Sequence, residues 1–172
     1  MKRDIFGFLD ESSLELNPRK RRFFGRRKIS ATLEKRKITI FGFMALNGKS
    51  VLMLSDKSKK EDFMAFLRLM RRENPKKRLV PLLDNAKIHW AKDSRKEADE
   101  LNIRMVFLPP YSPDLNPIEF CWKDLKRHLA KLLSFDEVVT EASRIAKGLM
   151  LERRFSYARS WLKSFGAVIG FS

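Results

Sequence analysis

The middle of the chain reads LVPLLDNAKIH from Leu79 to His89. The first five residues are almost continuously apolar, which is typical of a strand buried on both faces of a sheet. Asp84 and Asn85 follow at once, so the predicted strand ends where the chain becomes polar. In open α/β sheets, functional side chains gather beyond the carboxyl ends of the parallel strands. Asp84 is therefore the first candidate for a functional carboxylate.

Three further strands are predicted before this one. Asp4 to Leu9 is a short apolar run that stops at the polar group Asp10-Glu11-Ser12-Ser13, so Asp10 is also expected at the end of a strand. Lys37 to Leu46 and Ser50 to Leu54 flank Asn47-Gly48, which is a strong hairpin signal. We expect these two strands to pair antiparallel.

Helices and one more strand complete the pattern. From Lys59 to Arg72, apolar residues recur at steps of three and four, as in an amphipathic helix. Trp90 to Leu101 also predicts a helix, and Ile103 to Leu108 predicts a strand that Pro109-Pro110 stops. The last helices are predicted at Pro117 to Leu132, Asp136 to Met150 and Arg153 to Phe165. This order predicts an α/β fold whose mixed sheet is flanked by helices.

Size and composition indicate one basic domain. A chain of 172 residues buries roughly 70% of the surface that its unfolded form exposes. Its 37 Lys and Arg against 21 Asp and Glu give a formal charge of +16, so a polyanion is the expected partner. The single Cys121 excludes an intramolecular disulfide and fits a reducing cytosol. The most apolar stretch, Ile38 to Leu46, falls short of the roughly 20 residues of a membrane span, and no signal peptide is visible.

A second polar motif reads LPPYSPDLNPIEF from Leu108 to Phe120. Asn116-Pro117 is a helix-start signal, which puts Glu119 in the first turn of a helix. Positions 85 to 118, or 34 residues, separate Asp84 from Glu119. Together with Asp10-Glu11-Ser12, these segments resemble the Asp-Asp-Glu (DDE) catalytic domain of cut-and-paste transposases. The resemblance is to the group that holds the mariner family and its prokaryotic insertion-sequence relatives, within the retroviral integrase superfamily.

The resemblance implies a ribonuclease H-like fold with a five-stranded mixed sheet. In that fold the second and third strands pair antiparallel to the first, while the fourth and fifth run parallel to it and the fourth lies beside the first. It also implies that Asp10, Asp84 and Glu119 are catalytic and bind two Mg²⁺ or Mn²⁺ ions, with Asp10 bridging both. Asn85 and His89 match family positions beside the metal site. Three hard oxygen ligands suit these ions, and the lack of a Cys/His cluster argues against zinc.

Basic residues supply the predicted DNA contacts. Lys123 and Lys126 follow Glu119 by four and seven residues and so share its helix face. The richest basic cluster lies in a segment too charged for a core and comprises Arg19, Lys20, Arg21, Arg22, Arg26, Arg27 and Lys28. Because Phe23 and Phe24 stand inside it, this segment is expected to hold the DNA backbone.

The implied function is that of a transposase catalytic domain. Such a domain cleaves double-stranded DNA at transposon ends and joins a 3′-hydroxyl to target DNA, with a homodimer in the active complex. We expect residues 1–172 to form this one domain, without the N-terminal helix-turn-helix segment of full-length relatives. The chain then fits a catalytic half whose DNA-binding segment is encoded separately, a truncated copy or an expressed fragment. We also expect a cytoplasmic protein, associated with the nucleoid if the host is a prokaryote.

Two alternative functions stay open, and so do purely structural explanations of the carboxylates. The chain also fits another ribonuclease H-like nuclease, or a basic DNA-binding protein that has lost catalysis. Taken singly, Asp10 and Asp84 fit polar residues at strand ends, and Asn116 with Glu119 fits a capping box. Glu11 is an alternative ligand to Asp10.

Overall fold

The computed structural model describes residues 4–16, 36–110, 115–130, 132 and 135–169. In these ranges, five strands form one sheet in the order β3-β2-β1-β4-β5. The strands are β1 (Ile5–Leu16), β2 (Arg36–Ala45), β3 (Val51–Ser55), β4 (Leu79–Leu83) and β5 (Val106–Phe107). β2 runs antiparallel to both β1 and β3, whereas β4 runs parallel to β1 and β5 parallel to β4. The predicted antiparallel pairing of β2 with β1 and with β3, and the parallel directions of β4 and β5, are confirmed. The expectation that the third strand pairs antiparallel to the first is wrong, because β3 pairs with β2 at the edge of the sheet and therefore runs in the same direction as β1.

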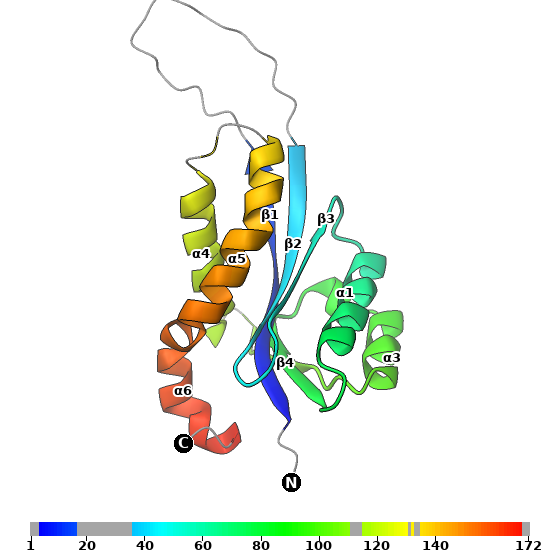
Figure 1. Ribbon diagram of the computed structural model, residues 1–172. Coiled ribbons are helices and arrows are strands. Elements are labelled where there is room, and N and C mark those ends of the chain that lie inside the picture. Colours follow the sequence, from blue (N-terminus) through cyan, green and yellow to red (C-terminus); the bar gives the residue numbers. More distant parts are fainter. Residues whose placement is uncertain (1–3, 17–35, 111–114, 131, 133–134, 170–172) are drawn as a thin grey trace, which may run out of the picture.

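Helices cover both faces of the sheet, as Figure 1 shows. The helical segments are α1 (Lys60–Glu73), α2 (Lys87–Trp90), α3 (Lys92–Glu100), α4 (Ile118–Leu129), α5 (Phe135–Tyr157), α6 (Arg159–Phe165) and the short 3₁₀ helix η2 (Gly166–Ile169). α1 and α3 lie on one face, and α4 and α5 on the other (Figure 1). None of the helices in the described ranges is long and apolar enough to cross a membrane.

The first strand is longer than predicted. β1 continues through Asp10 to Leu16 because its pairing with β2 continues to Leu16 opposite Arg36. Ser12 and Leu14 are buried in this extension. The expectation that the strand stops at Asp10 is therefore wrong, since cross-strand pairing outweighs the polar character of this segment.

The Asn47-Gly48 signal marks a real hairpin, but the connection between β2 and β3 is longer than a two-residue turn. The Asn47 amide accepts from the Phe6 backbone N–H at 2.9 Å and donates to the Asp4 carbonyl at 2.7 Å. A Cβ atom on Gly48 would come within 2.6 Å of Ile5 Cγ2. These two residues therefore pack against the start of β1.

Three further boundaries differ from the predictions. The helix expected from Trp90 to Leu101 is divided at Ala91 into α2 and α3, and the last strand shrinks to β5 plus one bridge between Ile103 and Leu79. The helix break expected near residues 151–152 instead falls at Ala158. No Gly or Pro stands at 151–152, so the helix has no local reason to stop there.

Two apolar clusters fill the space between the sheet and its helices. Trp122, Leu125 and Phe8 belong to the cluster beneath α4 and α5, whereas Phe63, Phe66 and Leu9 belong to the one beneath α1. Because successive strand residues point to opposite faces, β1 presents Asp10 on the same side as Phe8 and Glu11 on the same side as Leu9.

Candidate active site

Asp10 is a buried carboxylate in the middle of the sheet. Its residue is only 5% exposed, and its Oδ2 accepts a hydrogen bond from Trp122 Nε1 of α4 at 2.9 Å. Burial raises the pKa of Asp10 well above its ordinary value, and the charges of Glu119, Glu11 and Asp84 raise it further. The Trp122 hydrogen bond acts in the opposite direction. Negative charge is thus concentrated around Asp10 and is not neutralised by its hydrogen-bond partner.

A glycine makes the Trp122 contact possible. Gly42 of β2 stands opposite Asp10 in the strand register. A Cβ atom at Gly42 would lie 2.4 Å from the Trp122 ring and 2.9 Å from the Met150 methyl carbon. The indole therefore packs directly over the Gly42 backbone, which is the position from which it reaches Asp10.

Asp84 lies directly after β4, level with Asp10 of the neighbouring strand β1. The parallel pairing of β1 with β4 ends at Phe8 and Leu82, and two residues further along the strands reach Asp10 and Asp84. Asp84 Oδ1 accepts from the Ala86 backbone N–H and lies 3.0 Å from His89 Nδ1. The hydrogen bond from His89 is the main reason why the pKa of Asp84 falls below its usual range, although burial opposes it.

His89 links Asp84 to Glu11. The imidazole is fully buried, and its Nε2 lies 3.1 Å from Glu11 Oε1 while its Nδ1 faces Asp84. Burial lowers the pKa of His89, but the hydrogen bonds and charges of Asp84 and Glu11 outweigh it and raise the pKa to about 10. At neutral pH the ring is a cation that donates from both nitrogens. Glu11 therefore acts on Asp84 through His89.

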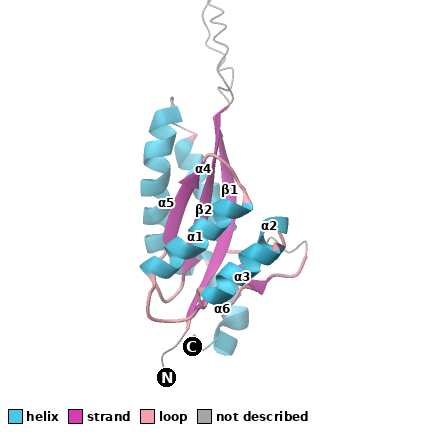
Figure 2. Ribbon diagram, turned by 90° about the vertical axis from the view of Figure 1, so that its right-hand side faces the viewer, coloured by secondary structure: helices cyan, strands magenta, loops and turns pink. Residues whose placement is uncertain are grey.

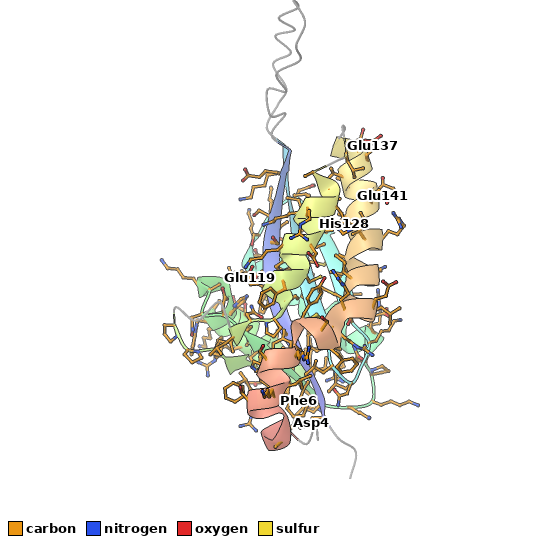
Figure 3. All side chains as sticks on the ribbon, turned by 90° about the vertical axis from the view of Figure 1, so that its left-hand side faces the viewer. Asp4, Phe6, Glu119, His128, Glu137 and Glu141 are labelled. Carbon is orange, nitrogen blue, oxygen red and sulfur yellow. The ribbon has the colours of Figure 1, made fainter. Side chains whose placement is uncertain are left out.

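Glu119 is contributed by the first turn of α4 (Figure 3). The capping box that was the alternative explanation of Asn116 and Glu119 does not form, because the helix N-cap is Pro117 and no side chain caps it. Glu119 is partly exposed, and its charge is the largest electrostatic contribution to the raised pKa of Asp10. Its carboxylate therefore faces the same cluster instead of returning to its own backbone.

Helix α4 is fixed to α5 by a buried carboxylate. Asp124 accepts hydrogen bonds from Tyr157 at 2.7 Å, from Arg153 at 2.8 Å and from Arg127 at 2.9 Å. The Tyr157 hydrogen bond and then the arginine charges keep the pKa of Asp124 below its usual range, although burial opposes them. This network holds the helix that carries both Glu119 and Trp122.

The donor set suits a hard divalent cation. Asp10, Asp84 and Glu119 supply carboxylate oxygens, which Mg²⁺ and Mn²⁺ prefer. Nevertheless, across the described ranges no three Asp, Glu, His or Cys side chains stand in a coordinating arrangement. Trp122 and His89 engage oxygens of the two aspartates instead. The residues fit a cation by chemistry and charge, and binding it would require the side chains to move closer together.

A sequence model for the family described as DDE superfamily endonuclease matches residues 6–140. This match includes all three carboxylates, Asp10, Asp84 and Glu119. The chain belongs to the DDE superfamily of endonucleases. No curated protein sequence matches this endonuclease.

Solved structures share the fold of this DDE endonuclease. The Mos1 transposase in its paired-end complex with the left transposon end is 18% identical, with a TM-score of 0.56 over 90% of this chain and 55% of that chain. The catalytic domain of Mos1 mariner transposase is 19% identical, with a TM-score of 0.54 over 92% and 81%. A chain of the simian T-cell lymphotropic virus intasome, in complex with PP2A regulatory subunit B56 gamma, is 10% identical, with a TM-score of 0.53 over 81% and 47%. These structures place the endonuclease in the ribonuclease H-like fold. The endonuclease spans about half the length of the matched chains in the Mos1 paired-end complex and in the viral intasome.

The remaining predicted site residues occupy different surroundings. Asn85 Nδ2 donates to the Leu108 carbonyl at 2.6 Å and so joins the ends of β4 and β5. Lys123 and Lys126 are exposed on α4, and Lys123 Nζ lies 5.2 Å from the centre of the Phe120 ring. The basic cluster from Arg19 to Lys28 lies outside the described residues.

Sequence reasoning misses three residues of this site. Sequence patterns give Trp122 and Gly42 no role in the site and make Glu11 only an alternative ligand. A weak signal exists for Glu11, because an acidic residue next to Asp10 on a strand must face the opposite layer. No sequence signal relates Trp122 or Gly42 to Asp10, since their contact crosses between β1, β2 and α4.

Proposed function

We propose that this chain is the catalytic domain of a DNA transposase. It cleaves double-stranded DNA at transposon ends and then transfers the strand by attack of a 3′-hydroxyl on target DNA. The observation that carries the proposal is that the charges of Asp84 and Glu119 raise the pKa of the buried Asp10 in a DDE superfamily endonuclease. Support also comes from relatives in the same fold that were solved as a Mos1 strand transfer complex and as paired-end complexes with Mn and with Mg.

Asp10, Asp84 and Glu119 would hold two Mg²⁺ or Mn²⁺ ions. Bound ions of this kind lower the pKa of an attacking water or hydroxyl and stabilise the leaving oxygen. The protein's own contribution is positioning: Trp122 orients Asp10 and His89 orients Asp84 through ring N–H groups. Such outer partners of metal ligands typically change affinity or activity about 10- to 100-fold when they are removed.

The wider assembly is part of the same proposal. Residues 1–172 act as one catalytic domain, in an active complex with a second copy of the chain. Selection of specific transposon ends requires base contacts, and we assign these to a DNA-binding segment on the same or a separately encoded chain. The Arg19 to Lys28 cluster, together with Lys123 and Lys126, supplies contacts to the phosphate backbone.

The direct test is cleavage of a supercoiled plasmid and of labelled duplex oligonucleotides with Mn²⁺, followed by analysis of nicked and strand-transfer products. Metal-dependent nicking and joined products support a transposase. Cleavage of the RNA strand of a hybrid without cleavage of duplex DNA would instead indicate another ribonuclease H-like nuclease. DNA binding that is indifferent to metal and gives no nick would indicate a protein that has lost catalysis.

Metal should stabilise the fold by relieving repulsion at Asp10. A ligand present at about one hundred times its dissociation constant adds roughly 2.7 kcal/mol to the state that binds it, which is several degrees in a domain of this size. We therefore expect Mn²⁺ to raise the melting temperature of the wild type. Asp10→Asn should melt higher than the wild type in EDTA, because it removes a buried charge, and should gain less from Mn²⁺.

Asp84→Asn is compared with Asp10→Asn in the same thermal unfolding experiment. It should melt lower than Asp10→Asn in EDTA, because it removes the partner of the charged His89 ring. It should also gain less from Mn²⁺ than the wild type. If Mn²⁺ raises the melting temperature of all three proteins equally, neither aspartate is a metal ligand.

DNA affinity should depend steeply on salt and little on sequence. A protein of charge +16 that contacts several phosphates releases counterions on binding, so its affinity falls linearly with salt on logarithmic axes. If six phosphates are contacted, affinity falls about a thousandfold or more between 50 and 200 mM salt. Fluorescence anisotropy on two unrelated duplexes measures both effects. A preference of roughly a thousandfold for one duplex, the low end of typical specific binding, would contradict this prediction.

A further inference from the structure

An exposed aromatic stack lies beside the carboxylates. Trp90, the last residue of α2, is 47% exposed, whereas Trp122 and Trp161 are 2% and 8% exposed. Its ring stacks on Phe107 of β5, with ring centres 4.0 Å apart and planes 16° apart. The Arg95 guanidinium carbon of α3 lies 5.7 Å from the centre of the Trp90 ring. The indole is therefore held in place by two partners while nearly half of its surface stays open to solvent.

Both aromatic residues of the stack are next in sequence to residues that contact Asp84 or Asn85. Trp90 directly follows His89, whose Nδ1 lies 3.0 Å from Asp84 Oδ1. Phe107 directly precedes Leu108, whose carbonyl accepts from Asn85. Figure 2 shows α2 and α3 together on the same side of the molecule. The exposed indole therefore lies a short distance along the surface from Asp84.

Cations lie beside the stack. Lys87, Lys92 and Arg95 are exposed on α2 and α3. The acidic residues of α3 nearest to them are neutralised from α1, since Asp93 pairs with Lys60 at 2.7 Å and Glu97 with Arg68 at 2.7 Å. The surface thus combines an aromatic face with cations that attract phosphate, as in proteins that bind single-stranded nucleic acid.

We propose that Trp90 is a stacking platform for an unpaired base of the DNA strand next to the cleavage site. The inference rests on the proposed function, because it takes its ligand to be the substrate DNA. A base inside a duplex already has both faces covered by its neighbours, so only a base in a single-stranded extension, a nick or a frayed end offers a face to the indole. Lys87, Lys92 and Arg95 would hold the adjoining phosphates.

The test compares two oligonucleotides in EDTA, a blunt duplex and the same duplex with a short unpaired thymine extension. Since Trp122 and Trp161 are buried, Trp90 dominates the solvent-sensitive fluorescence. We expect the extension to quench wild-type emission beyond the quenching by blunt duplex. Trp90→Ala should weaken binding of the extended DNA by about tenfold or more and leave binding of the blunt duplex within about twofold. Trp90→Phe should keep most of the affinity for the extended DNA.

Phe155→Ala is the matched control. Phe155 is 50% exposed on α5, and the Arg154 guanidinium carbon lies 5.0 Å from the centre of its ring. Its removal should change neither affinity. The stacking role of Trp90 would be contradicted if Trp90→Ala lowered the affinity for both DNAs equally, or for neither. It would also be contradicted if both DNAs quenched the fluorescence of the wild type equally.

The outcome separates this inference from the proposed function. Phe155→Ala should retain Mn²⁺-dependent cleavage of plasmid DNA. If cleavage depends on Asp84 but Trp90 does not discriminate between the oligonucleotides, only the platform is wrong. If extension-dependent quenching occurs without any metal-dependent cleavage, Trp90 binds an unpaired base but the proposed function fails.

Discussion

Asp10→Asn, Asp84→Asn and Glu119→Gln are each expected to lower DNA cleavage by about a thousandfold or more. Each change removes one of the proposed charged oxygen ligands while preserving the size of the side chain. Metal ions contribute several kcal/mol of transition-state stabilisation, and each 1.36 kcal/mol corresponds to a factor of about ten in rate. Plasmid nicking with Mn²⁺, measured as initial rates, gives the result for each variant.

DNA binding provides the counterpart of this measurement. Each substitution removes a negative charge, so affinity for duplex DNA should stay equal to that of the wild type or rise slightly. Glu152→Gln, an exposed change on α5, should leave both cleavage and binding unaltered. Wild-type cleavage by Asp84→Asn would exclude the proposed site.

Gly42→Ala should impair both stability and cleavage. The added Cβ atom would overlap the Trp122 ring, because the two would be only 2.4 Å apart. Overpacking of this kind costs about 1–3 kcal/mol, and each kcal/mol lowers the melting temperature by about 2–4 °C in a domain of this size. Displacement of Trp122 also removes the N–H donor of Asp10, so we expect cleavage to fall by about 10- to 100-fold.

The same substitution at Gly148 supplies a matched control. An added Cβ at Gly148 of α5 meets no atom within 4 Å, and alanine is favoured over glycine in a helix by about 1 kcal/mol. Gly148→Ala should therefore raise the melting temperature and leave cleavage unchanged. Trp122→Phe tests the hydrogen bond itself, because it removes the N–H without adding an atom at position 42. Full activity and stability in Gly42→Ala would show that Trp122 does not need its present position.

The two aspartates are held by different aromatic donors on opposite faces of the sheet. Trp122 reaches Asp10 from the α4 layer, whereas His89 reaches Asp84 from the α1 layer and is itself held by Glu11. The charge on His89 compensates Asp84, but the neutral indole leaves the charge of Asp10 largely uncompensated. Asp10 is therefore the carboxylate with most to gain from a bound cation.

The sequence by itself determined the elements whose signals are local. Leu79 to Leu83 forms the buried strand that its apolar run predicted, the stripe from Phe63 to Met70 forms an amphipathic helix, and Asp84 follows β4 as expected. The spacing of Asp84 and Glu119 also indicated the family that the profile match confirms.

Only the tertiary structure decided where β1 ends and what surrounds the carboxylates. Asp10 lies within β1, because the pairing with β2 carries the strand past a polar stretch that looks like a turn in sequence. The hydrogen bond from Trp122 joins residues 112 positions apart, and the contact between His89 and Glu11 joins residues 78 positions apart. Local sequence patterns carry no information about such pairs, because their geometry depends on how β1 packs with β2 and α4 on one face of the sheet and with α2 on the other.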